Sequence, residues 1–111
     1  MNKVTLIGNI IRDLELKNYE GGCYTRFTLA INDFNRKARQ LDPVFINVVA
    51  FGKKAETLSK YISKGRKLAV EGRLNNSSYV TKEGIKRYST EVILEDFDFV
   101  DRKKENKENV V

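Results

Sequence analysis

The sequence predicts an all-β fold with one short helix, and three observations lead to this class. Several segments alternate apolar and polar residues with the period of a strand, as do Phe27, Leu29 and Ile31. Residues 53–64, by contrast, have apolar residues at helical spacing and predict a short helix. The chain has 111 residues and 41% of them are hydrophobic, which is enough for one packed domain.

The first half of the chain predicts three strands. Residues 2–12 form a strand with apolar residues on both faces, so we expect this strand to pair with something beyond its own core. A hairpin turn at Gly21-Gly22 leads to a second strand over residues 24–32. The polar and basic residues 33–43, which end at the only proline, predict a mobile loop before a third strand over residues 44–51.

The third strand has two different faces. The even-numbered positions carry modest branched or small side chains and are expected to point into the core. The odd-numbered positions are expected to point outward, and they are Phe45, Asn47, Val49 and Phe51.

The second half predicts a helix and two more strands. The helix covers residues 53–64 and ends at Gly65, and strands follow over residues 68–80 and 88–94. The order strand, strand, strand, helix, strand, strand is that of a five-stranded OB-fold Greek-key barrel, with the helix between strands 3 and 4. We expect residues 1–102 to form this single domain and residues 103–111 to be a short, charged, disordered tail.

Composition argues against an enzyme. The chain has no histidine, so it has no imidazole for general base or metal-ligand chemistry near neutral pH, and it has no glycine motif that cradles phosphates. The acids Glu95, Asp96, Asp98 and Asp101 could in principle hold Mg²⁺, but they alternate with phenylalanines as the solvated face of a strand does. We therefore expect no catalytic residue, no metal and no cofactor.

The single cysteine and the start of the chain predict a cytoplasmic protein. One cysteine cannot form an intramolecular disulfide, and the first residues lack the apolar region of a secretory signal. No apolar run approaches the roughly 18 residues of a membrane span.

Charge and exposed aromatics together predict a nucleic-acid-binding surface. The net charge is +6, and residues 1–94 carry 17 basic against 9 acidic side chains. A basic domain attracts polyanions, although a merely solvated basic surface would give the same count. Four aromatic residues fall on the outward strand face, in the basic loop or beyond strand 4, where bases can stack on them; they are Phe34, Phe45, Phe51 and Tyr79. Taken singly, each could instead be a core residue or an oligomer contact.

Basic residues interleave with these aromatics and are candidates for phosphate contacts. They are Lys37, Arg39, Lys53, Lys54, Arg73, Lys82 and Arg87.

Several motifs in register resemble the bacterial single-stranded DNA-binding protein family. They are FINVVAFGKKAE at 45–56, YISKG at 61–65, VEGRL at 70–74 and GIKRYSTEV at 84–92, together with the opening MNKVTLIGN. The match runs in order from residue 1 to about residue 100.

The resemblance implies an OB-fold homotetramer, a dimer of dimers, that binds single-stranded DNA without sequence preference during replication, recombination and repair. It implies a nucleoid-associated protein. The stacking positions of the family fall on the four aromatics named above, and its phosphate-contacting lysine falls on Lys53. Typical members continue into a long linker and an acidic tip that recruits replication and repair proteins, so the sequence predicts a short form in which such recruitment is in doubt.

Two other interpretations share the barrel and the basic surface. One is an accessory OB-fold protein of the primosome type, and the other is an RNA-binding OB-fold module. Preference for RNA, or tolerance to loss of the outward aromatics, would separate them from a single-stranded DNA-binding protein.

Overall fold

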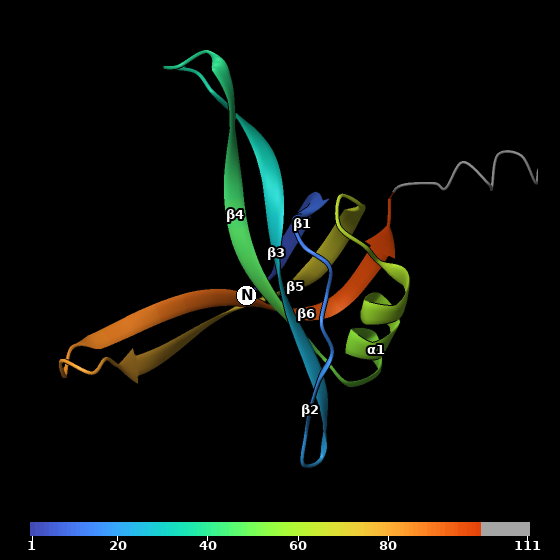
Figure 1. The fold of residues 1–111 in the computed structure, drawn as a ribbon. Coiled ribbons are helices and arrows are strands. Elements are labelled where there is room, and N and C mark those ends of the chain that lie inside the picture. Colours follow the sequence, from blue (N-terminus) through green and yellow to red (C-terminus); the bar gives the residue numbers. More distant parts are fainter. Residues whose placement is uncertain (101–111) are drawn as a thin grey trace, which may run out of the picture.

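A computed structural model describes residues 1–100, so the predicted domain end at residue 102 and the predicted tail at 103–111 lie outside the described residues. The elements in chain order are β1 (Val4–Ile10), β2 (Lys17–Tyr19), β3 (Gly22–Asn35), β4 (Gln40–Phe51), α1 (Gly52–Tyr61), β5 (Lys67–Val80) and β6 (Lys86–Phe99). Figure 1 shows α1 beside a small central barrel from which long hairpins project.

Five strands close into a barrel. The sheet order is β1-β5-β6-β4-β3-β2, and an additional pairing of β1 with β3 joins the two sides. Among these strands, β4 and β6 pair in parallel and the other pairs are antiparallel. This is the predicted five-stranded OB barrel with a helix between its third and fourth barrel strands, and β2 is a short addition to the edge of β3.

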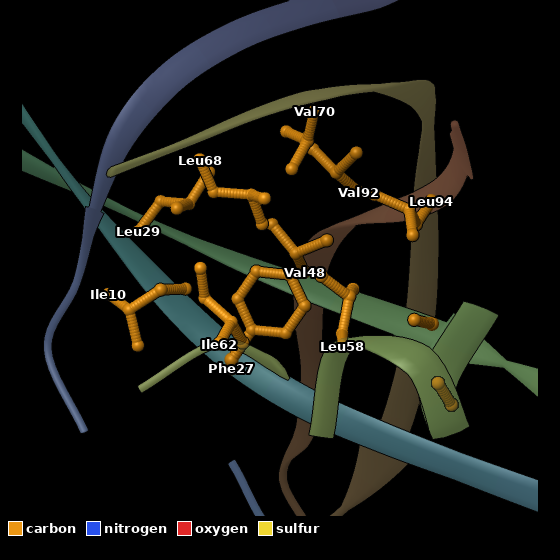
Figure 2. Close-up of a cluster of buried hydrophobic side chains, with 12 residues drawn as sticks. Ile10, Phe27, Leu29, Val48, Leu58, Ile62, Leu68, Val70, Val92 and Leu94 are labelled. Carbon is orange, nitrogen blue, oxygen red and sulfur yellow. The ribbon is translucent and has the colours of Figure 1, made fainter. Parts of the chain in front are cut away.

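The barrel interior is a compact apolar cluster contributed by all five barrel strands and α1 (Figure 2). The helix contributes Ala55 and Leu58, both fully buried, because these two residues lie on the same face one turn apart. Leu29 and Val48 from β3 and β4 are also fully buried. Burial of this cluster is the main source of the domain's stability.

A glycine shapes the middle of β5. The register between β5 and β6 shifts at a bulge between Glu71 and Gly72. A Cβ placed on Gly72 would lie 2.1 Å from the carbonyl oxygen of Ile93, so only glycine allows the two strands to approach this closely.

Residues 33–43 differ from the prediction of a mobile loop. β3 and β4 remain paired as far as Asn35 and Gln40 and form a long two-stranded ribbon, the β3–β4 ribbon. The turn is therefore confined to residues 36–39. Pro43 lies inside this ribbon opposite Asn32, where β4 has no second neighbour because it pairs with β6 only at Val48 and Val49. An edge strand can lack the N–H that proline removes.

The turn itself is organised by Asn35. Its side-chain oxygen accepts the backbone N–H groups of Lys37 at 3.0 Å and Ala38 at 3.1 Å, as in an Asx turn. Its side-chain nitrogen donates to Asp42 at 2.6 Å, and Arg39 adopts the left-handed conformation with φ 55°. Local polar contacts therefore order a segment that carries no apolar pattern.

The helix is shorter than predicted. α1 ends at Tyr61 rather than residue 64, and Ile62 already has an extended backbone. Gly65 does not terminate the helix, since its N–H donates to the carbonyl oxygen of Ile10 in β1 at 2.7 Å. Tyr61, the last residue of the helix, is exposed.

Candidate nucleic-acid interface

The outer face of β3 and β4 carries three of the four predicted stacking residues. Phe45 and Phe51 lie on β4, and Phe34 lies on β3 opposite Leu41, so the register puts all three side chains on the same face. Their exposed fractions are 58% for Phe34, 59% for Phe45 and 47% for Phe51. Along the ribbon Phe45 lies roughly 13 Å from Phe34 and roughly 20 Å from Phe51, so each ring offers a separate stacking position.

The outer face of β5 and β6 carries the fourth aromatic. Tyr79 is 55% exposed and pairs in register with Arg87, and Arg73 pairs in register with Ile93 on the same face. Ile93 is in turn the register partner of Val49 on β4. β5 and β6 form a second two-stranded ribbon, the β5–β6 ribbon. The outer faces of the β3–β4 ribbon and the β5–β6 ribbon are therefore continuous through the parallel pairing of β4 with β6.

Val49 differs from the expectation for its face. It was expected to point outward to solvent with Phe45 and Phe51, but it is 1% exposed. Its register neighbours are Arg26 on β3 and Ile93 on β6, so it lies where the outer faces of the ribbons meet and has neighbours on both sides.

The predicted cations are all exposed but occupy different places. Lys37 and Arg39 lie in the turn at the tip of the β3–β4 ribbon, and Lys82 lies at the tip of the β5–β6 ribbon. Lys53 and Lys54 lie in the first turn of α1, directly after Phe51 and at the opposite end of β4 from the ribbon tip. The two ribbon tips and the start of α1 thus place positive charge around the aromatic face.

Arg73 is the one predicted phosphate contact that forms an ion pair in the described part of the chain. Its Nη1 lies 3.4 Å from the Glu95 carboxylate, and both side chains are about half exposed. Such an exposed pair is weak, so Arg73 can exchange Glu95 for another anion.

A groove of about 660 Å³ runs between the two ribbons and the segment that follows β1. Thr28 and Asn47 line it and share a hydrogen bond of 2.8 Å. Tyr24 and Tyr79 also line it, one from β3 and the other from β5. Sequence reasoning did not select Tyr24 as a site residue, and only the strand register, which puts it opposite Phe51, could have found it.

Two of the four acids considered for Mg²⁺ have other partners. Glu95 pairs with Arg73, and Asp96 accepts the backbone N–H of Phe97, while Asp101 lies outside the described residues. Within residues 1–100, no three acidic or cysteine side chains are grouped so that they could hold a metal ion.

No helix in the described residues is long and apolar enough to cross a bilayer.

A closed five-stranded barrel with an aromatic and basic outer face defines the class of OB-fold binding proteins. The family model described as the single-strand binding protein family matches residues 1–100. The chain therefore belongs to the single-strand binding protein family, a family of DNA-binding proteins and not of enzymes.

Relatives agree with this assignment. The chain is 46% identical over 103 residues to a single-stranded DNA-binding protein of Clostridium perfringens. The matched region covers 91% of this chain and 67% of the relative. Over 113 residues it is 42% identical to single-stranded DNA-binding protein 2 of Clostridium acetobutylicum, covering 99% of this chain and 85% of the relative. Over 108 residues it is 39% identical to single-stranded DNA-binding protein 1 of Staphylococcus aureus, and the matched region covers 96% of this chain and 69% of the relative. The predicted family and fold are confirmed.

Proposed function

We propose that the protein binds single-stranded DNA without sequence preference and protects it during replication, recombination and repair. Bases stack on Phe34, Phe45, Phe51 and Tyr79, and the seven predicted basic residues pair with phosphates. The observation that carries the proposal is that all four aromatics lie exposed on one continuous outer face while the barrel core closes without them.

The arrangement favours single strands over duplex. A ring on a strand face can stack only on a base whose own face is free, and duplex bases are stacked on each other. Stacking is tolerant of sequence because every base has a π-face. The rings here are phenylalanine and tyrosine, and the chain has no tryptophan, so a labelled oligonucleotide is needed to follow binding.

The test is a titration of dye-labelled oligo-dT with wild-type protein and the variants Tyr79→Ala and Tyr61→Ala. The two tyrosines are matched, since both are 55% exposed, but Tyr61 lies on α1 outside the outer face of the ribbons. We expect Tyr79→Ala to weaken binding by about 1–3 kcal/mol and Tyr61→Ala to leave it unchanged.

Competition separates the alternatives. Excess duplex DNA should not displace labelled oligo-dT from the wild type, and oligo-U should compete less well than unlabelled oligo-dT. Equal displacement by duplex would refute the stacking surface, and stronger displacement by oligo-U would favour an RNA-binding module. Equal losses in Tyr79→Ala and Tyr61→Ala would also contradict the proposal.

We also propose that the protein is a homotetramer, a dimer of dimers, assembled in part through β1. Within the described residues, β1 pairs with β5 over residues 4–9 but with β3 only at Asn9 and Ile10. Residues 4–8 therefore have an unpaired edge, and Ile7 beside it is 53% exposed. Light scattering at micromolar concentration should give the mass of a tetramer, and a monomer mass would refute this assembly.

A further inference from the structure

Arg26 lies on β3 at the point where the two ribbons meet. It is the register partner of Val49, and its side chain is 61% exposed on the outer face. Its guanidinium carbon lies 5.3 Å from the centre of the Tyr24 ring, and its Nε lies 3.4 Å from the Glu91 carboxylate on β6. Sequence reasoning did not select Arg26, because its two partners come together only in the folded barrel.

The contacts of Arg26 hold one end of the guanidinium and leave the other end available. Glu91 engages Nε, and the two terminal nitrogens have no partner among the described residues. The Tyr24 ring beneath is itself supported by neighbouring rings, with Phe51 at 6.4 Å and Tyr19 at 6.0 Å between centroids. The planar guanidinium lies over a ring and contacts Glu91 through Nε, so its remaining donors form a fork that matches the geometry of a phosphate.

The position of Arg26 lies on the path between the proposed stacking residues. It lines the groove between the ribbons together with Tyr79, and the register places it between Tyr24, opposite Phe51, and Thr28, opposite Asn47. A strand that stacks on both Phe51 and Tyr79 has to carry its backbone across this groove. The groove also contains the Glu91 carboxylate, so without a cation at this point the passage would be unfavourable for phosphate.

We propose that Arg26 is a further phosphate-contacting residue of the single-stranded DNA path, positioned by Tyr24 and Glu91. This inference rests on the proposed function. The other explanation is that Arg26 serves only to link β3 to β6. One contact of 3.4 Å on an arginine that is 61% exposed is a weak structural link, whereas the free terminal donors fit an incoming anion.

The first experiment compares the salt dependence of oligo-dT binding for wild type, Arg26→Gln and Lys60→Gln. Lys60 is the matched control, since it also lies over a tyrosine ring, at 5.4 Å from the centre of Tyr61, but on α1 outside the groove. We expect Arg26→Gln to reduce the slope of log affinity against log salt by about 0.7, and to weaken binding about fivefold at about 0.1 M salt, because one fewer phosphate is neutralised. Lys60→Gln should change neither quantity.

Two further variants separate contact from positioning. Arg26→Lys keeps the charge and should restore the salt slope while recovering only part of the affinity, since lysine lacks the planar fork. Tyr24→Leu should weaken binding in the wild-type background and have no added effect in Arg26→Gln, if the ring acts by supporting the guanidinium. A further loss in the double variant would refute the positioning role of Tyr24.

Failure of this inference is distinguishable from failure of the proposed function. If wild type binds oligo-dT, Tyr79→Ala weakens it and Arg26→Gln leaves affinity and slope unchanged, Arg26 is not a contact and the stacking surface stands. If wild type does not prefer oligo-dT over duplex, the proposed function fails. A purely structural Arg26 would lower the unfolding midpoint of Arg26→Gln without changing the salt slope of the folded protein.

Discussion

The two faces of β4 differ in which side chains they bury and which they expose. Val48 and Ala50 point into the barrel and are fully buried, whereas Phe45 and Phe51 on the alternate positions are 59% and 47% exposed. The larger rings are thus on the solvent side and the smaller side chains inside, the reverse of what burial of apolar area alone would favour. The inner face therefore stabilises the barrel, the outer face is the proposed binding surface, and substitutions on the two faces should affect different measurements.

The largest expected effect is on stability, from the inner face. Leu29→Ala removes a fully buried side chain from the core and leaves a cavity, so the free energy of unfolding should fall by about 2–5 kcal/mol. Urea unfolding followed by circular dichroism measures this loss. The control is Leu41→Ala on the β3–β4 ribbon, where the side chain is 62% exposed and the change should stay within about 0.5 kcal/mol.

Below its unfolding transition, Leu29→Ala should bind oligo-dT as the wild type does. A large loss of affinity in the folded variant would mean that the two faces are coupled, and would contradict the division of roles between them.

The next effect is on affinity, from the outer face. Phe45→Ala should weaken oligo-dT binding by about 1–3 kcal/mol while the unfolding midpoint stays near that of the wild type, because the ring is 59% exposed and is not in the core cluster. Phe45→Trp keeps a stacking ring and introduces the only tryptophan of the chain, so DNA binding should quench its fluorescence. Absence of quenching at saturating oligo-dT would remove Phe45 from the stacking set.

The contrast between the faces also explains what the sequence could reveal. Inner positions such as Leu29 and Val48 follow the two-residue period of a strand, so the barrel strands and much of the core were predictable. The extension of β3 and β4 through residues 33–43 was not, because a two-stranded ribbon beyond the barrel buries neither face and shows no apolar alternation. Its turn depends on hydrogen bonds of Asn35, which composition does not indicate.

The outer face was predictable only in part. Large aromatics at alternate positions of a strand identified Phe45 and Phe51 as candidates, since a small barrel cannot hold both strand faces. Arg26 could not be found this way, because Glu91 lies 65 positions further along the chain and meets it through two strand pairings. Register between distant strands decides which charges meet, and a single sequence does not specify it.

The smallest expected effect comes from Glu91, where the two ribbons meet. Its side chain is 14% exposed and its carboxylate lies in the groove that the DNA backbone is proposed to cross. Glu91→Gln removes the negative charge but keeps an oxygen that can accept the Nε hydrogen bond of Arg26, so the arginine stays in place while repulsion of phosphate disappears. We expect oligo-dT affinity to rise a few-fold, which corresponds to about 1 kcal/mol or less.

The control for Glu91→Gln is Glu20→Gln, which removes the same charge in the exposed turn between β2 and β3. A general effect of net charge would raise affinity equally in both variants, whereas an effect local to the groove raises it only in Glu91→Gln. Weaker binding by Glu91→Gln would mean that the carboxylate helps to orient Arg26 by more than its charge costs the phosphate. In that case the link between β3 and β6 would contribute to binding as well as to the fold, and the separation between the two faces would be incomplete at this one position.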